Sequence, residues 1–238
     1  MLWQGIISPM LLSRDQILAH KKKGTIIIDP YEDRQLKTTS YDVTMGEWYW
    51  KERVPESGRA TVHNLYDEES TKRIWDGPYQ AENVKTLLQK LHLPELINIP
   101  DSAKIILLGP GETILGHTNE FIGGKDIVVA KMYAQSSMGR NFIEVCKDAG
   151  WGDVGYFNRW TMEITNNSQY HTVPLVIGRH IAQMVFYEVA PLKEAAIDYV
   201  GEGGKYQSSN KLDELKKSWN PAMMIPQMHK DWEIKAGK

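Results

Sequence analysis

The chain has 238 residues, of which 42% are hydrophobic and 24% are charged, a balance typical of a globular protein with one good hydrophobic core. The formal net charge of −2 argues against a general nucleic-acid-binding protein, although a nucleotide pocket needs only a few local cations. The single cysteine, Cys146, excludes an internal disulfide and is typical of a cytoplasmic protein. We expect no secretory leader at residues 1–10, which lack a basic start, and no apolar run is long enough to span a membrane.

The amino-terminal part of the chain predicts one helix and two strands. Ser13-Arg14-Asp15-Gln16 is a capping-box pattern, and the helix that follows is expected to end at Gly24, after three lysines. Residues 25–28 are an apolar run that indicates a short buried strand, which Asp29-Pro30 ends. Residues 40–46 alternate between polar and apolar side chains like a second strand.

Residues 52–100 are expected to form an inserted helical segment. Within them, residues 79–93 carry Val84, Leu87, Leu88 and Leu91 at helical spacing. This spacing predicts an amphipathic helix whose apolar side packs against the rest of the protein. No chemistry attaches to the segment.

From Lys104 onward the pattern is that of many short strands separated by turn residues, which indicates a barrel, a sandwich or a jelly roll. We expect Gly123-Gly124 to separate two of these strands. The chain from about residue 200 is expected to be mobile and to contain a terminal helix at residues 212–219, within a single domain of residues 1–238. Strands are expected at residues 105–108, 112–116, 126–133, 159–166, 173–177 and 180–189.

Glu163 is the first candidate for chemistry. Its strand alternates, so that Trp160, Met162 and Ile164 share one face while Glu163 lies on the other with its threonine neighbours. The carboxylate is either exposed on a solvated face or enclosed in a pocket, where burial would raise its pKa and let it carry protons.

Two turns offer groups that recognise a polar ligand. Arg140 follows the hydroxyls of Ser136 and Ser137, and this combination either donates to a phosphate or makes a surface salt bridge. Asp153 lies in a glycine-rich turn at residues 150–156, where it either bonds its own backbone or reads a sugar hydroxyl, because the glycines permit a ligand to approach the main chain closely.

The sequence offers no zinc site. His117, His171 and His180 lack metal-ligand spacing, and one cysteine cannot supply the Pro-Cys-x-x-Cys part of the zinc nucleobase deaminase signature. No Walker loop or dinucleotide-binding fingerprint is present either.

Several separated blocks together resemble the dCTP deaminase branch of the dUTPase-like superfamily. Each block is weak alone, but their order is fairly specific, and the resemblance covers roughly residues 10–50 and 104–210. The blocks are residues 12–17, 28–31, 40–46, 111–118, 136–140 and 149–153, then Glu163 and residues 204–207.

The resemblance implies a mainly β, dUTPase-like distorted jelly roll or β-clip with a few peripheral helices. It also implies a homotrimer with sites between subunits, and hydrolytic deamination of dCTP to dUTP and ammonia without zinc. Glu163 would then be the general base and acid, Ser136 and Arg140 would orient Glu163 and the water, and the backbone of Ala149 would hold that water. Mg²⁺ would be carried on the substrate phosphates with no direct protein ligand, and neither a nucleic acid nor a membrane is an expected partner. The implied substrate contacts are Asp153 with the deoxyribose 3′-hydroxyl, Ser137, Lys205 and Tyr206 with the phosphates, and Trp151 and Gln207.

The chain departs from the family pattern near the expected site. Gln135 stands where the family usually has arginine, and Cys146 and Asp148 stand where it usually has histidine and threonine. An added carboxylate beside a triphosphate would repel it unless Mg²⁺ or Lys147 compensates. A dUTP diphosphatase, a bifunctional enzyme that continues to dUMP and pyrophosphate, and a non-catalytic nucleotide-binding homologue are the alternatives to a simple deaminase.

Overall fold

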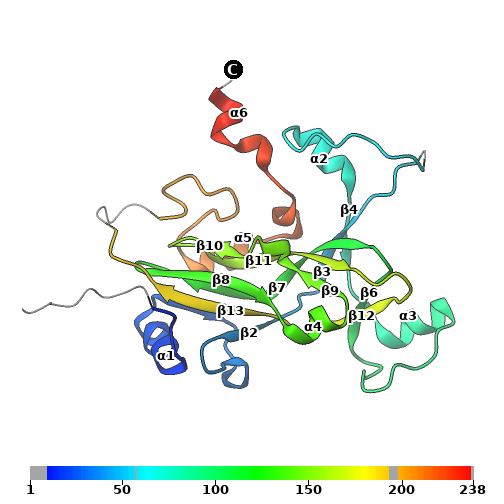
Figure 1. Ribbon diagram of the computed structural model, residues 1–238, viewed down its shortest axis with the longest axis horizontal. Coiled ribbons are helices and arrows are strands. Elements are labelled where there is room, and N and C mark those ends of the chain that lie inside the picture. Colours follow the sequence, from blue (N-terminus) through cyan, green and yellow to red (C-terminus); the bar gives the residue numbers. More distant parts are fainter. Residues whose placement is uncertain (1–9, 57, 193–197, 237–238) are drawn as a thin grey trace, which may run out of the picture.

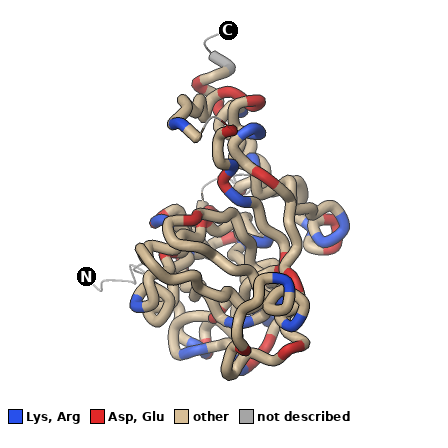
Figure 2. The backbone as a smooth tube through the Cα atoms, turned by 90° about the vertical axis from the view of Figure 1, so that its right-hand side faces the viewer, with Lys and Arg blue, Asp and Glu red and all other residues tan. Residues whose placement is uncertain are grey.

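A computed structural model describes residues 10–56, 58–192 and 198–236 of the chain (Figure 1). Antiparallel sheets form the body of the molecule, and the carboxy-terminal segment projects from it in both Figure 1 and Figure 2. The predicted mainly β class is confirmed. The expectation of no leader at residues 1–10 falls almost wholly outside the described residues.

The largest sheet has six strands, and a single long strand, β7, holds it together. Strands β3, β11 and β1 all pair with β7, and every pairing in the sheet is antiparallel. The order is β4-β3-β7-β11-β9, with β1 off this path. The bounds are β1 Ile26–Asp29, β3 Trp48–Glu52, β4 Trp75–Gln80, β7 Thr113–Gly124, β9 Ile143–Val145 and β11 Phe157–Asn166.

Two smaller antiparallel sheets complete the β structure. One has the order β10-β8-β13-β2 and the other β12-β6-β5. The bounds are β2 Tyr41–Thr44, β5 Glu82–Asn83, β6 Lys104–Leu108, β8 Val128–Ala134, β10 Trp151–Gly152, β12 Val173–Val176 and β13 His180–Glu188.

The main hydrophobic core takes side chains from both larger sheets. Met162 of β11 and Met184 of β13 are both fully buried in it. Alternate positions of each strand point inward, which is why one face of β11 belongs to the core and the other is free to carry polar groups.

Short helices lie at the edges of the sheets. The predicted amino-terminal helix is confirmed as α1: the Gln16 side chain accepts a hydrogen bond of 2.9 Å from the Ser13 backbone N–H, and Gly24 ends the helix at φ 80°. The helices are α1 Arg14–Lys23, α2 Glu68–Ile74, α3 Val84–Leu91, α4 Ser136–Arg140, α5 Leu212–Ser218 and α6 Trp232–Ala236, with 3₁₀ turns η1 Asp33–Gln35, η2 Cys146–Asp148, η3 Pro221–Met224 and η4 Met228–Lys230.

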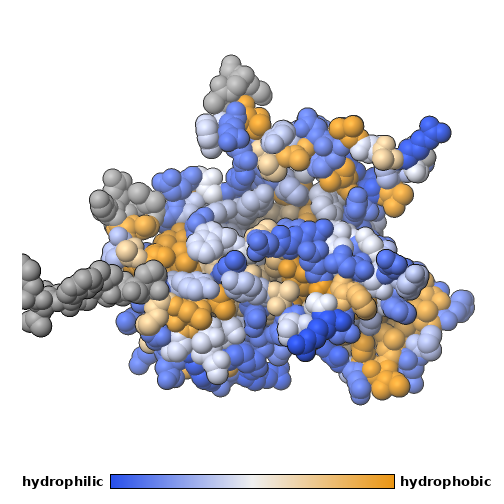
Figure 3. Space-filling view, viewed as in Figure 1, coloured by the Kyte–Doolittle hydropathy of each residue, from blue (hydrophilic) through white to orange (hydrophobic). Residues whose placement is uncertain are grey.

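The inserted segment contains strands as well as helices. The helix predicted over residues 79–93 is wrong at its start, because residues 75–80 pair with β3 and only then does Asn83 cap α3, accepting 3.3 Å from the Thr86 N–H. Its apolar side packs as predicted, since Val84, Leu87 and Leu88 are buried. Figure 3 shows apolar surface at the lower right, in the region of α3, where Leu91 is exposed.

The Gly123-Gly124 pair does not lie between two strands, contrary to the prediction. Both glycines continue β7 and pair with β1. A Cβ at Gly123 would lie 1.9 Å from the Tyr156 carbonyl oxygen, so glycine is needed here for close backbone packing and not for a turn.

The carboxy-terminal segment begins on the large sheet with α5 and then projects from the body of the molecule. The predicted terminal helix is confirmed as α5, and its Leu215 packs with Phe121 and Phe157 on the large sheet. Beyond α5 the chain continues through η3 and η4 to α6. Figure 2 shows basic and acidic residues interspersed along the chain. Among the described residues, no helix is long and apolar enough to cross a membrane.

Candidate active site

Strand β11 places Glu163 as the alternation predicts. Trp160, Met162 and Ile164 are buried on the core face, whereas Thr161 and Glu163 are only partly buried on the other. Pairing with β7 sets Glu163 opposite Leu115 and fixes its position along the sheet. The carboxylate is therefore held by a strand with partners on both sides, β7 and β9.

Glu163 lines a pocket of about 440 Å³ with largely apolar walls. Aromatic rings form much of one wall, and three side chains of the carboxy-terminal segment form another. The pocket is also lined by Leu115, Ala149, Trp151, Tyr156, Tyr199, Tyr206, Met224, Pro226 and Met228.

The pocket changes the acidity of its titratable groups. Burial raises the pKa of the Glu163 carboxyl, and its own backbone N–H and the positive charge of Lys147 offset part of that rise. The neighbouring Cys146 thiol has its pKa raised to about 12, chiefly by burial and further by the negative charge of Glu163. Cys146 is thus an inert thiol, and Glu163 is the group in the pocket suited to take up and release a proton.

The turn after Ala149 brings Trp151 and Asp153 together. The Trp151 indole Nε1–H donates 2.9 Å to Asp153 Oδ1. A Cβ at Gly152 would lie 2.5 Å from the Trp160 ring, so the close approach that this glycine permits is used by the protein's own core. The Asp153 side chain does not bond its own backbone among the described contacts, and none of these contacts involves its second carboxylate oxygen.

Asp153 opens onto a second, larger pocket of about 850 Å³. Lys205 lines the same pocket and forms a salt bridge with Asp231 near the carboxy terminus. Tyr199 lines both pockets, and the centre of its ring lies 4.9 Å from the centre of the Tyr156 ring. The structure therefore brings Glu163, Trp151 and Tyr206 to one pocket and Asp153 and Lys205 to its neighbour.

Gln207 has a place in the fold that the sequence did not indicate. Its side-chain Nε2 donates 2.7 Å to the Gly155 carbonyl, and its Oε1 accepts 2.8 Å from the Phe157 N–H. The side chain is buried, with both ends of the amide bound to backbone. It lines neither pocket and positions the turn that carries Asp153.

Ser136, Ser137 and Arg140 lie on α4, and all three are exposed. They do not line the pocket of Glu163, and no contact between Arg140 and Glu163 occurs among the described residues. Within one chain, the Arg140 guanidinium therefore makes no contact with the Glu163 carboxylate that it is expected to orient. Contacts within one chain therefore do not bring Ser136 and Arg140 to Glu163.

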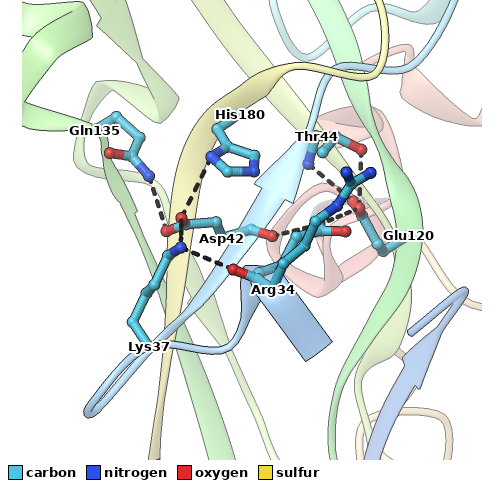
Figure 4. A network of polar contacts seen from close by, with 8 residues as sticks. Arg34, Lys37, Asp42, Thr44, Glu120, Gln135 and His180 are labelled. Carbon is cyan, nitrogen blue, oxygen red and sulfur yellow. Dashed lines mark hydrogen bonds and ion pairs between the residues drawn. The ribbon is translucent and has the colours of Figure 1, made fainter. Parts of the chain in front are cut away.

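The start of α4 is held by a polar network around the buried side chain of Asp42, drawn in Figure 4. Gln135 Nε2 donates 2.8 Å to Asp42 Oδ1, while Lys37 Nζ and His180 Nδ1 lie 3.3 Å and 3.4 Å from Asp42 Oδ2. Gln135 is thus committed to fixing α4 on β2. The other departures behave differently: Asp148 is exposed, and its nearest described cation is Lys131 at 3.9 Å.

Tyr199 and the pocket-lining residues of the carboxy-terminal segment were missed by sequence reasoning. Met224, Pro226 and Met228 follow a predicted helix in a region with no motif, and their approach to Glu163 depends on how the chain returns over the sheet. No local signal in the sequence marks them. Among the described residues, no group of three or more histidine, cysteine, aspartate or glutamate side chains is placed to hold a metal.

The chain thus places one carboxylic acid among largely apolar side chains, next to a second pocket whose lining includes several charged residues. The family profile described as dCTP deaminase-like matches residues 11–189. The chain belongs to this family, whose members are hydrolases acting on C–N bonds.

Curated relatives span most of the chain. A "dCTP deaminase, dUMP-forming" from Methanosphaerula palustris is 29% identical over 75% of this chain and 81% of its own length. One of the same description from Dictyoglomus turgidum is 30% identical over 84% of this chain and 90% of its own. A "dCTP deaminase" from Halorubrum lacusprofundi is 27% identical over 84% and 88%.

Solved structures show a partial likeness. A 2′-deoxycytidine 5′-triphosphate deaminase from Agrobacterium tumefaciens is 15% identical with a TM-score of 0.49, over 76% of this chain and 49% of that one. The present chain thus matches about half the length of that protein. The EIAV dUTPase is 20% identical with a TM-score of 0.31, over 39% of this chain and 79% of that one.

Proposed function

We propose that the protein hydrolyses dCTP at C4 of the cytosine ring and releases ammonia. Water adds to C4, and its proton passes through the Glu163 carboxylate to N3 of the ring. Glu163 then takes the remaining proton from the new C4 hydroxyl and delivers it to the exocyclic amine, the C4–N bond breaks, ammonia leaves, and C4 becomes the carbonyl of uracil. The observation that carries this proposal is the placement of a single carboxylic acid, with its pKa raised by burial, in a pocket whose aromatic walls suit a flat nucleobase.

The reaction needs a group that both accepts and returns a proton. A carboxyl at its ordinary pKa is a weak base near neutral pH, and burial in the apolar pocket raises that pKa toward the working range. The backbone of Ala149 at the pocket edge is proposed to hold the attacking water. The rings of Trp151 and Tyr206 then restrict where a flat base can lie.

The neighbouring pocket is proposed to take the sugar and the phosphates, with Asp153 on the 3′-hydroxyl. Its described charged residues are Asp153, Asp198, Glu202, Asp231, Lys205 and Lys230, so carboxylates outnumber lysines. A bare triphosphate would be repelled there, which supports a substrate that arrives as its Mg²⁺ complex. Ser137 and Tyr206 are proposed as further phosphate donors, Tyr206 from the adjoining pocket of Glu163 and Ser137 from α4 of a neighbouring subunit.

A trimer with shared sites is part of the proposal. The exposure of Ser136 and Arg140 and their separation from Glu163 within one chain support a site completed by a neighbouring subunit. Light scattering should give the mass of three chains. A fully active monomer would refute the shared site.

Mixed trimers provide a sharper test. Arg140→Ala and Glu163→Gln should each be inactive alone. If the two residues come from different subunits, trimers formed by unfolding and refolding the variants together contain some intact sites and regain a fraction of the wild-type rate. No regain, with mixed trimers demonstrated by mass spectrometry, would place both residues in the same subunit's site.

The second candidate product is dUMP. The relatives described as "dCTP deaminase, dUMP-forming" favour it. Formation of dUMP from dCTP would require loss of pyrophosphate as well as deamination. Incubation with dCTP, dCMP or dUTP and Mg²⁺, with ammonia and pyrophosphate measured separately, decides among the candidates. Ammonia alone indicates a deaminase, both products from dCTP a bifunctional enzyme, and pyrophosphate from dUTP alone a diphosphatase. Neither product, with tight nucleotide binding, indicates a non-catalytic homologue.

A further inference from the structure

The chain beyond α5 covers the candidate active site and is attached to it at a few polar points. Met224 is buried, and with Pro226 and Met228 it walls the pocket of Glu163. The Gln227 backbone N–H donates 3.1 Å to the Tyr206 hydroxyl. These residues lie outside the region that matches the family, which ends at residue 189.

The most distal of these contacts involves a cation proposed to serve the substrate. Lys205 Nζ is paired with Asp231 Oδ1, and the two side chains are 26% and 29% exposed. Trp232, the next residue, lines the same pocket. The lysine offered to nucleotide phosphates is therefore already occupied by a carboxylate of the chain itself.

We propose that Asp231 is an internal competitor for nucleotide phosphates, which sets the affinity of the site for them and holds residues 224–232 over the pocket until a polyphosphate takes Lys205. This inference rests on the proposed function, because it takes Lys205 as a phosphate contact. It assigns a role in substrate recognition to a segment that the deaminase chemistry does not itself require.

Charge decides the direction of the exchange. A carboxylate brings one negative charge to Lys205, whereas a triphosphate brings several and can keep its other charges on Mg²⁺. The ion pair is partly exposed, so water and salt weaken it and a better anion can replace it. A nucleoside lacks that anion and leaves the pair intact.

Release of Asp231 loosens the segment from its free end. Behind Asp231 along the chain, His229 Nε2 lies 3.8 Å from Glu68 Oε2 and the Gln227 N–H donates to the Tyr206 hydroxyl, whereas the Pro221 carbonyl stays anchored by a 2.9 Å hydrogen bond from the Trp50 indole N–H. Displacement at Lys205 thus opens the pocket of Glu163 while the root of the segment remains on the sheet. The Lys205–Asp231 ion pair thus acts as a latch, because binding of the phosphates at Lys205 is coupled to entry of the base into the pocket of Glu163.

The test compares Asp231→Asn with Glu233→Gln in the full-length protein. Glu233 lies two residues further on, is exposed and forms no ion pair with the residues that the structure describes, so its variant removes the same charge from the same segment without touching Lys205. Calorimetry with Mg²⁺ and inorganic tripolyphosphate, dCTP or deoxycytidine measures binding. Asp231→Asn should bind tripolyphosphate and dCTP about fivefold more tightly, which is the scale of a partly exposed ion pair, and deoxycytidine unchanged. Glu233→Gln should match the wild type throughout.

Two further measurements make the result specific. In a Lys205→Ala background, Asp231→Asn should bring no gain, because the contested cation is gone. Hydrogen exchange of wild-type residues 224–232 should speed up when tripolyphosphate is added.

Unchanged or weaker dCTP binding in Asp231→Asn overturns the inference. Ammonia release by that variant then shows that the proposed deaminase activity stands without the latch. If neither tripolyphosphate nor dCTP binds the wild type or Asp231→Asn, Lys205 is not a phosphate contact and the inference is overturned. Absence of ammonia release, combined with the expected binding pattern, would instead refute the activity and leave the latch in place.

Discussion

The sheet framework and the carboxy-terminal segment are attached to the active site by different kinds of contact. In the framework, the carboxyl of Glu120 is buried and accepts from the Thr44 N–H and hydroxyl at 3.0 Å and 2.8 Å and from Gln35 at 3.0 Å. The carboxy-terminal segment is attached by single ion pairs, Lys205–Asp231 and His229–Glu68, and by isolated hydrogen bonds. The position of Glu163 is therefore set by the rigid sheet framework, while access to it is set by the carboxy-terminal segment, which is easier to displace.

The largest effect is expected where the framework meets the chemistry. Glu163→Gln keeps the shape of the side chain and removes the base, so ammonia release from dCTP should fall by about a hundredfold or more while nucleotide binding is largely kept. Glu144→Gln, on the exposed side of neighbouring strand β9, is the matched control and should retain the wild-type rate. Near-normal turnover in Glu163→Gln would show that another group carries the proton.

The same substitution in the two regions measures how firmly each is packed. Met162→Ala removes a fully buried side chain from the core of the sheets and should cost about 3 kcal/mol of unfolding free energy. Met224→Ala removes a side chain that borders an existing pocket, where water can enter, and should cost about 1 kcal/mol. Urea unfolding measures both. Equal losses would mean that the carboxy-terminal segment is as much a part of the core as β11.

The buried polar contacts of the framework should matter more than any surface pair. Glu120→Gln turns an acceptor into an amide whose NH₂ faces the Thr44 and Gln35 donors, at a cost of about 2 kcal/mol in unfolding free energy. Glu144→Gln again serves as the exposed control. An unchanged urea midpoint in Glu120→Gln would show that these donors find other acceptors.

Local patterns in the sequence were sufficient for the framework and for the position of Glu163. The alternation of β11 assigned Trp160 and Met162 to the core and Glu163 to the opposite face, because side-chain direction in a strand follows the local period. The capping box at Ser13 likewise marked a helix start that depends on four residues only.

Features set by distant parts of the chain could not be read in this way. The start of α3 was misplaced because residues 75–80 satisfy their backbone groups on β3, a partner about 30 residues away in the sequence. Gln207 was predicted to bind substrate, but its amide serves the backbone of the Asp153 turn, which only the folded chain brings near. The pocket wall formed by Met224 and Met228 likewise depends on contacts between distant parts of the chain.

The smallest expected effect is a dependence of stability on pH that comes from Glu163. Because burial raises its pKa in the folded state, the folded protein holds this proton more tightly than the unfolded chain does. The stabilisation from the protonated carboxyl is complete below the unfolded pKa and is lost as pH rises through the folded pKa. Glu163→Gln has no such group, so wild type and variant should have similar stability in acid, and the variant should become the more stable of the two toward neutral pH.

Other titrating groups cancel when the two proteins are compared at each pH. His117 works in the opposite direction: burial lowers its pKa to about 4, so it makes both proteins less stable as pH falls from the ordinary histidine range toward that value. Urea unfolding at a series of pH values, taken as the difference between wild type and Glu163→Gln, isolates Glu163. A difference that stays constant with pH would mean that the carboxyl is solvated in the folded state, and the pocket would then offer no raised proton affinity for the reaction to use.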